Sequence, residues 1–397
     1  MNWVLFLLPA AALVVAAWTG GMETLSAATL AAAEGAVPLA LGLVGVMALF
    51  LGLMKVAEKG GLLDATARVL SPLLVRLFPE VPPDHPAMGA MVMNVAANLL
   101  GLGNAATPFG IRAMEHLESL NPVKGTATNA QVLFLAINTA SVTILPTSVI
   151  ALRSGLGSAN PAAVVAPTLI ATLVSTGVAI LSARLLQGGR SVPAVTKTTA
   201  PVWGLAVAGL GLAGLIAALV AWGQTIGHWI IPSLVVALLG FGLWRRVAIY
   251  DAFVEGAGEG FRVAVRIIPY LVAILVAVGM VRASGALALV LEPLGRLTQL
   301  VGVPAEAVMM AAMRSLSGSG SFGLLAEQMK NAAIGPDSFS GVLLGTIYGS
   351  SETTFYVIAV YFGAVGIRRI RHALACGLIA DAAGLVAAVI ACRLLIA

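Results

Sequence analysis

Long apolar segments dominate the chain and predict a series of membrane-spanning helices. A helix needs about 20 predominantly apolar residues to cross about 30 Å of hydrocarbon. Segments that approach or reach this length lie near 3–18, 36–56, 128–152, 163–184, 203–222, 228–244, 267–283, 338–362 and 373–392. This pattern predicts an all-α polytopic membrane protein with nine spans.

Two regions combine charges with helix-breaking sequence. Each begins with an amphipathic segment, Leu63–Phe78 in one region and Leu287–Val301 in the other. Each then continues as two short apolar segments around a polar break, NVAANLLGLGNAATPFG at 94–110 and RSLSGSGSFG at 314–323. Irregular backbone at membrane depth is tolerated only where it is buried in protein or lines a cavity. We therefore expect an interfacial helix and then a re-entrant helical hairpin in each region.

The two halves of the chain resemble each other. AAEGAVPLALGLVGVMALFLGLM at 32–54 parallels GEGFRVAVRIIPYLVAILVAVGM at 258–280. NTASVTILPTSVIALRSG parallels GSSETTFYVIAVYFGAVG, and the pair Phe109-Gly110 parallels Phe322-Gly323. We place the division at three segments: repeat one at 1–187, a cytoplasmic linker with a connecting transmembrane helix at 188–225, and repeat two at 226–397.

Span parity makes this repeat an inverted one. Each repeat holds four spans, and the extra helix at 203–222 lies between them, so the second repeat enters from the opposite side. The first hairpin then enters from the cytoplasmic side and the second from outside, with the two tips meeting near the midplane. Interrupted segments at matching positions in two halves indicate a transporter binding site.

The basic residues act mainly as topology signals. Only 10% of the residues are charged, against about 25% in soluble domains. Most Lys and Arg clusters fit a cytoplasmic N-terminus and an outside C-terminus. Their scatter over helix ends gives no indication of nucleic-acid binding. Five basic residues fall outside or at the outer edge against this rule: Arg153, Arg282, Arg296, Lys330 and Arg393.

Polar residues around the breaks form a candidate site for a small polar solute or a Na⁺ ion. A charge at bilayer depth, such as Glu352 within GSSETT, costs at least ~2.5 kcal/mol and is by default a functional candidate. The full set is Asn98, Asn104, Thr107, Asn138, Thr139, Ser141, Thr143, Arg314, Ser317, Ser319, Ser321, Ser350, Ser351, Glu352 and Thr353. The alternative for each hydroxyl is a hydrogen bond within its own helix.

Four charged residues leave alternatives open. Arg314 can pair with Glu352, bind an anionic solute group, or reach an interface. The candidate proton carriers are Glu352, Glu327 and Asp381. Glu327 can equally face the outer headgroups, and Asp381 can equally be held by a structural partner.

Metal and enzyme chemistry are not expected. Cys376 and Cys392 lie sixteen residues apart on one predicted helix, too far for a mutual disulfide. The four His show no ligand spacing, and no nucleophile–base or metal motif is present. We expect no cofactor and no enzymatic activity, only coupling to H⁺ or Na⁺.

The chain also resembles two known families. GLLDATARVLSPLLVRLFPEVPPDHPAMGAMVMNVAANLLGLGNAATPFG resembles bacterial spore maturation protein A. RSLSGSGSFGLLAEQMKNAAIGPDSFSGVLLGTIYGSSETTFYVIAVYFG resembles spore maturation protein B. The chain is thus similar to a fusion of the two, so that the first repeat is spore maturation protein A-like and the second spore maturation protein B-like. Both families carry the nucleoside recognition (Gate) domain, which concentrative nucleoside transporters and ferrous iron transporters share. The resemblance implies membrane transport, with solute contacts at Asn104, Thr107, Asn138, Thr143, Ser317, Ser319, Ser321 and Glu352.

These observations favour an ion-coupled carrier or exporter of a small polar metabolite, working by alternating access. Glu352 is the first candidate for the coupling ion. The alternatives are a non-transporting component of an envelope or sporulation complex and a divalent-metal permeation path. The expected location is the bacterial plasma (inner) membrane, and the expected partners are lipid and the solute. The oligomeric state is open, a homo-oligomer included.

Overall fold

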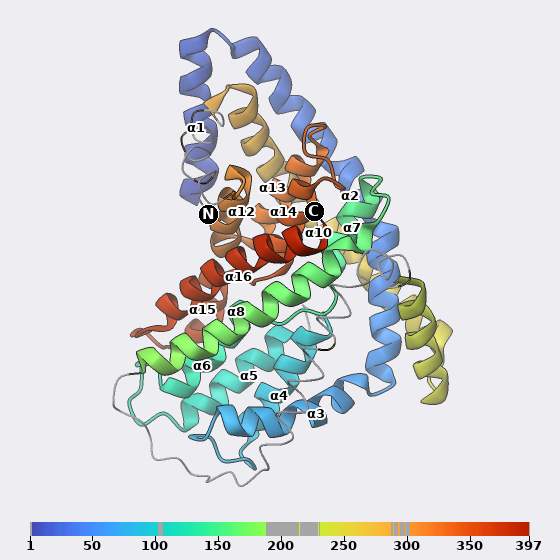
Figure 1. The fold of residues 1–397 in the computed structure, drawn as a ribbon, viewed down its shortest axis with the longest axis vertical. Helices are drawn as coiled ribbons and strands as arrows, with labels where there is room; N and C mark the ends of the chain where they lie inside the picture. Colours follow the sequence, from blue (N-terminus) through green and yellow to red (C-terminus); the bar gives the residue numbers. More distant parts are fainter. Residues whose placement is uncertain are drawn as a thin grey trace.

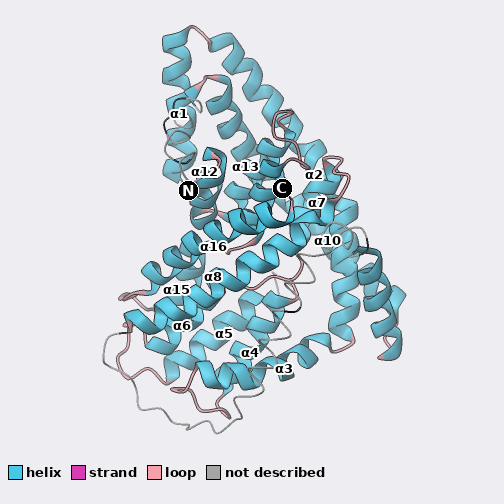
Figure 2. Ribbon diagram, in the orientation of Figure 1, coloured by secondary structure: helices cyan, strands magenta, loops and turns pink. Residues whose placement is uncertain are grey.

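The computed structural model describes the chain at 2–101, 106–187, 214, 229, 231–286, 289, 293, 298 and 302–396. Regular structure in these residues is helical, as expected, apart from one isolated bridge between Thr126 and Arg369 (Figure 2). The helices are α1 (Asn2–Thr19), α2 (Met22–Lys59), α3 (Leu62–Leu77), α4 (Pro86–Leu99), α5 (Ala106–Ser119), α6 (Asn129–Ala140), α7 (Thr147–Gly155), the short 3₁₀ helix η2 (Pro161–Val164), α8 (Val165–Leu186), α10 (Ile249–Ala283), α12 (Ala305–Leu316), α13 (Gly318–Lys330), α14 (Phe339–Gly349), α15 (Thr354–Ala364) and α16 (Ala373–Leu395).

The same order of elements occurs twice along the chain (Figure 1). A long helix (α2 or α10) precedes a helical hairpin (α4–α5 or α12–α13). A helix in two pieces follows (α6–α7 or α14–α15), and a long apolar helix (α8 or α16) ends the series. The amphipathic α3 matches the predicted interfacial helix of the first half. Its counterpart at 287–301, the linker and the extra helix at 203–222 lie almost entirely outside the described residues.

The two central spans are not continuous helices. The apolar segment at 128–152 unwinds between α6 and α7, and that at 338–362 unwinds between α14 and α15. In the first, Pro146 lacks an N–H and disfavours helical backbone at the residue before it. Ser141 ends α6 with a φ of 23°, a conformation that a non-glycine residue rarely adopts. The unwound backbone contains Ser141 and Thr143 in the first span and the residues at 350–353 in the second, whereas Asn138 and Thr139 remain in the last turn of α6.

The helix α2 is longer than the predicted span at 36–56. Three helices in the described residues are long and apolar enough to cross a membrane, at Met22–Lys59, Pro161–Leu186 and Ala373–Leu395. The predicted spans at 3–18 and 36–56 leave a connector between them, but α2 begins at Met22 and has 38 residues. Its first turns are rich in Ala, the strongest helix former. At 1.5 Å per residue α2 is about 57 Å long, so it exceeds the hydrocarbon thickness.

The buried side chains form two large cores, and the unwound segments lie between them. One core contains α7, α14, the C-terminal part of α16 and facing residues of α2, α10 and α12–α13. The other contains α3 to α6, α15 and the N-terminal part of α16. Each broken helix thus begins in one core and ends in the other. Because each span is broken, its first piece packs in one core and its second piece packs in the other (Figure 1).

The basic residues that violate the charge rule are held by specific partners. Arg153 is fully buried and donates to Asp337 Oδ1 at 3.0 Å, to Asn160 O at 2.9 Å and to Pro336 O. The other three described exceptions also have partners: Arg282 pairs with Glu327 at 2.6 Å, Lys330 donates to Gly35 O at 3.3 Å, and Arg393 donates to Gly302 O. Arg296 lies outside the described residues. The four described residues therefore have partners within the protein.

Asp337 joins a loop of the second half to the buried Arg153 of the first half. Burial raises the pKa of this carboxyl, but the Ser158 hydroxyl, the Ala159 N–H and the Arg153 guanidinium together hold the pKa below its usual value. A carboxyl with a lowered pKa stabilises the folded state above the pKa of the unfolded chain, and that contribution is lost as pH falls through the folded value.

We predict that Asp337→Asn destabilises the protein by about 1 kcal/mol at neutral pH, near the upper limit for a half-exposed pair. The difference from wild type should shrink as pH falls below about 4, where the unfolded chain takes up the proton, and should be lost once pH passes the lower pKa of the folded protein. Thermal unfolding across pH in detergent measures both effects. Asp64→Asn, an exposed position on α3, is the control. A deficit that persists unchanged in acid would contradict the electrostatic origin of the effect.

Candidate functional site

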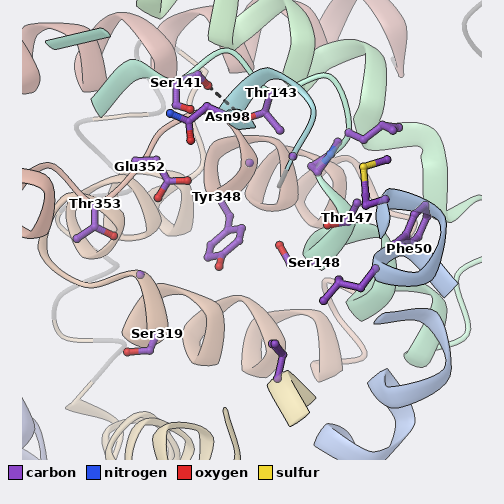
Figure 3. A pocket seen from close by; sticks show the side chains of 18 of the residues that line it. Phe50, Asn98, Ser141, Thr143, Thr147, Ser148, Ser319, Tyr348, Glu352 and Thr353 are labelled. Atoms are coloured by element: carbon purple, nitrogen blue, oxygen red, sulfur yellow. Dashed lines mark hydrogen bonds between the residues drawn. The ribbon is translucent and has the colours of Figure 1, made fainter. Parts of the chain in front are cut away.

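A cavity of about 750 Å³ lies where the two unwound segments meet the hairpin tips (Figure 3). Eight of the residues selected from the sequence line it: Asn98, Ser141, Thr143, Arg314, Ser317, Ser319, Glu352 and Thr353. They come from α4, the two breaks and the second hairpin, segments that are far apart in the sequence. The cavity is large enough for a metabolite-sized solute.

Arg314 and Glu352 form an ion pair at the cavity wall. Arg314 Nη2 lies 3.4 Å from Glu352 Oε2, and Arg314 Nε donates to Ser351 O at 2.7 Å. The guanidinium also stacks 4.4 Å from the centre of the Tyr348 ring, a cation–π contact. The Arg314 side chain is 8% exposed, whereas Glu352 is 48% exposed. The carboxylate therefore keeps a free side that faces the cavity (Figure 3).

The tip of the second hairpin packs directly on the second break. Ser317 caps α13 by accepting a hydrogen bond from Gly320 N at 3.0 Å. A Cβ at Gly318 would lie 2.9 Å from Thr353 Oγ1 and 3.2 Å from Arg314 Nη1. A side chain there would require the Thr353 hydroxyl or the Arg314 guanidinium to move, so glycine suits this close approach.

The first hairpin is joined to the core by a network of amides. Asn98 Nδ2 donates to Asn138 Oδ1 at 3.0 Å, and Asn94 Nδ2 donates to Ala106 O at 2.8 Å and to Tyr361 Oη at 3.2 Å. Tyr361 in turn donates to Asn138 Oδ1 at 3.3 Å. The first half of the site is thus uncharged in these contacts, and the second half contains the ion pair.

Backbone contacts connect the breaks to each other and to the first tip. Glu352 N donates to Thr139 O at 2.8 Å, which joins the second break to the end of α6. Ile144 N donates to Leu99 O at 3.3 Å. Gly101 has a φ of 73°, and a Cβ there would approach Leu145 O to 3.1 Å. The two breaks leave some backbone N–H and C=O groups without partners in a helix. These contacts pair some of those groups.

The remaining candidates lie behind the cavity wall. Asn138, Thr139, Ser321, Ser350 and Ser351 are buried, and their contacts are with hairpin or break residues or within their own helices. Thr107 is half-buried in the first turn of α5. Asn104 lies outside the described residues. None of the described residues in this group is among those that line the cavity.

The two other acids selected from the sequence also lie away from the cavity lining. Glu327 pairs with Arg282 at 2.6 Å, and its side chain is 12% exposed. Asp381 on α16 accepts hydrogen bonds from Ser315 and Thr354.

Several lining residues were not singled out from the sequence. Tyr348, Tyr356, Ser148 and Phe50 contribute aromatic and hydroxyl surface (Figure 3). Tyr348 lies four residues before Glu352 in the sequence. This spacing is the only sequence signal that would have pointed to Tyr348. The other lining residues depend on tertiary contacts that no local pattern records.

One end of the cavity is charged. Lys55, interpreted from the sequence only as a topology signal, lines the cavity with Glu58 and Glu259. Its Nζ lies 3.3 Å from Glu58 and 3.8 Å from Glu259. Within the described part of the chain, no group of three His, Cys, Asp or Glu could hold a metal ion. The available groups are those that bind a polar organic solute through hydrogen bonds and ion pairs.

Different parts of the chain match known proteins. The family described as "Gate: Nucleoside recognition" matches residues 40–156. Spore maturation protein A of Bacillus subtilis is 45% identical over 163 residues, covering 41% of this chain and 83% of that protein. Spore maturation protein B of the same organism is 44% identical over 165 residues, covering 42% of this chain and 92% of that protein. Two separate relatives matched in this way are consistent with a fusion.

The fold is similar to that of a transporter of known structure. The structure of CNTnw in an inward-facing substrate-bound state aligns with a TM-score of 0.50 and 15% sequence identity, covering 99% of this chain and 92% of that one. At this identity the likeness concerns the fold alone.

The close approach of Gly110 to Tyr361 gives a test of how the first hairpin is held. A Cβ at Gly110 would collide with the ring and hydroxyl of Tyr361. We predict that Gly110→Ala destabilises the protein by roughly 1–3 kcal/mol through overpacking. Gly89→Ala is the matched control on the same hairpin, since nothing lies within 4 Å of its added Cβ, and should stabilise by ~0.5–1 kcal/mol. Thermal unfolding measures both.

The Tyr361→Leu background separates this contact from other effects. There, Gly110→Ala should cost less, because the side chain that it would meet is gone. Equal costs in both backgrounds would show that Tyr361 does not hold the hairpin.

Proposed function

This chain belongs to the spore maturation protein A and B families, and we propose that it is a membrane carrier of a small polar metabolite. The observation that supports this most is the position of the cavity. It lies at the junction of two broken helices and two hairpin tips, and each broken helix passes there from one core to the other. A site between two packed bodies can open to either side as they move.

The hairpins are the proposed gates. Asn98, on the helix that leads to the first tip, contacts Asn138 ahead of the first break, and Gly318 at the second tip contacts Thr353 in the second break. Movement of a hairpin relative to its break would open the cavity on that side. In the inverted topology expected from the sequence, the two gates face opposite sides of the membrane, which is what alternating access requires.

The lining favours a solute with both a planar or apolar part and several hydrogen-bonding groups. Phe50, Tyr348 and Tyr356 offer aromatic surface, and Asn98 and Ser319 offer amide and hydroxyl groups. Glu352 has a free carboxylate side and suits a hydroxyl or amine donor of the solute. The name of the matching family, nucleoside recognition, agrees with a polar organic solute. A divalent-metal path is less favoured, because no His or Cys is among the cavity-lining residues.

Coupling to H⁺ or Na⁺ would make the carrier concentrative, and Glu352 is a candidate for the ion as well as for the solute. Its substitution by Gln keeps the size and removes the charge. If Glu352 carries the ion, ion-driven uptake should be lost in proteoliposomes.

A thermal-shift screen of the purified protein against a library of polar metabolites tests the proposal. We expect at least one compound to raise the unfolding temperature of wild type in a dose-dependent manner. Glu352→Gln should reduce its affinity by about tenfold or more, as expected for loss of a hydrogen bond to a charged group. Glu23→Gln, exposed at the start of α2, should bind as wild type does.

Two outcomes of this screen would argue against a carrier. If no metabolite shifts the unfolding temperature, or if Glu352→Gln and Glu23→Gln respond alike to every hit, the cavity is not a solute site. The chain would then be better described as a non-transporting membrane component.

A further inference from the structure

Asp381 lies directly behind the cavity wall. Its Oδ2 accepts a hydrogen bond from Ser315 Oγ at 2.6 Å and another from Thr354 Oγ1 at 2.8 Å. Ser315 follows the cavity-lining Arg314 in the second hairpin, and Thr354 follows the cavity-lining Thr353 at the second break. The acid therefore joins the hairpin to the broken helix one residue away from the cavity on both sides.

The other carboxyl oxygen of Asp381 has no partner. Oδ1 is buried and accepts no hydrogen bond from the described residues. The other two acids selected from the sequence each form an ion pair: Glu352 with Arg314 and Glu327 with Arg282. Asp381 takes part in none of the ion pairs of the described chain, although it belongs to the same part of the fold.

Within the described residues no cation forms an ion pair with Asp381, and the one positive charge that acts on it from nearby is that of Arg314. In the described helices packed against α16, α6 has no titratable side chain and α8 has only Arg184 near its end. The titratable side chains on the other neighbours, α12, α14 and α15, are Glu306, Arg314, Tyr348, Tyr356 and Tyr361. Arg314 is the basic one among these, and its guanidinium is already bonded to Glu352 and Ser351.

This environment satisfies a neutral carboxyl better than a carboxylate. In the neutral acid, Oδ2 is the carbonyl oxygen that accepts both hydroxyl hydrogen bonds, and Oδ1 carries the proton. In the carboxylate, Oδ1 would be a buried charged oxygen with no hydrogen-bond donor and no ion pair among the described residues, and the nearby charge of Arg314 is already paired with Glu352. That is more costly than one unmet neutral hydroxyl. The contacts of Asp381 therefore favour the protonated acid.

We propose that Asp381 is a proton-carrying residue that couples protonation to movement of the second hairpin. The neutral carboxyl holds Ser315 and Thr354 together. When its O–H bond breaks and the proton passes to water, the carboxylate still accepts from both hydroxyls, but Oδ1 becomes a charged oxygen without a donor in this arrangement. The packing around Oδ1 must then open to admit water, which moves the hairpin relative to the broken helix. The inference rests on the proposed carrier function, and it assigns proton coupling to a residue behind the solute site.

Infrared spectroscopy of the purified protein tests the protonation state without any solute. Wild type at neutral pH should show the carbonyl-stretch band of a protonated carboxylic acid, and Asp381→Asn should lose that band. Asp64→Asn, exposed on α3, should keep it. Ser315→Ala leaves the acid in place and should shift the band, because one hydrogen bond to the carbonyl oxygen is removed. An unchanged band in Asp381→Asn and in Ser315→Ala overturns the proposal.

The pH dependence of stability gives a second readout. An acid that stays neutral in the folded state ionises first in the unfolded chain, so wild type should lose stability as pH rises above about 4. The ratio of the unfolding constants of wild type and Asp381→Asn should change by about tenfold per pH unit over this window, as for one proton. Parallel profiles, or a difference that follows Na⁺ concentration instead of pH, overturn the proposal.

Cysteine labelling tests the coupling to the hairpin. Ser319→Cys places a thiol at the cavity, while the native Cys376 and Cys392 are buried. Its maleimide labelling rate is compared with that of Ser319→Cys/Asp381→Asn at each pH, so that the thiol's own ionisation cancels. We expect the ratio to rise several-fold from acid to alkaline pH. A constant ratio overturns the coupling.

These outcomes are separable from those of the metabolite screen. The spectroscopic and labelling measurements need no solute, so their failure removes the proton role and leaves the carrier proposal intact. Failure of the screen removes solute binding and leaves the protonation of Asp381 as measured.

Discussion

The structure depends on how backbone groups are satisfied where the two central helices unwind. Unpaired N–H and C=O groups cannot face hydrocarbon, so each break must obtain partners from elsewhere in the protein. The contacts found here come from the opposite break and from the hairpins: Glu352 N bonds to Thr139 O, and Arg314 donates to Ser351 O. Because hairpin contacts replace part of the helix ladder, the hairpins, the breaks and the cavity form a single unit.

This constraint explains why the polar residues concentrate as they do. The hairpin tips approach the breaks closely only because glycine occupies Gly101 and Gly318. Polar side chains around them then either pair with each other, as in the amide network of Asn98 and Asn138, or face the cavity, as Glu352 does. The two halves use different side chains to hold a hairpin against a break. The first relies on neutral amides, and the second on an ion pair backed by an aromatic ring, which makes it the more sensitive to charge.

Local sequence patterns predicted an interrupted helix in each of the two regions, because Gly, Ser and Asn clustered within apolar sequence favour a break over a continuous span. They predicted the polar runs at 138–143 and 349–354 but not that the backbone unwinds there, since periodicity alone cannot separate a polar helix turn from a break. The predicted spans at 3–18 and 36–56 left a connector between them because only the most apolar residues were counted, whereas the Ala-rich sequence continues the helix from Met22. Lys55 and Tyr348 were not assigned to the site, because their cavity position depends on contacts between distant elements.

The sequence by itself determined the class of the molecule: an all-helical membrane protein with matching interruptions in two halves and polar residues beside them. It did so because hydrophobic length and helix-breaking residues act locally. Only the tertiary structure decided which polar groups meet. It paired Arg314 with Glu352 and Arg282 with Glu327, and it left Asp381 with two hydroxyl donors and no ion pair in the described chain. The charge state and role of a buried acid depend on neighbours from other helices, and packing alone brings those neighbours together.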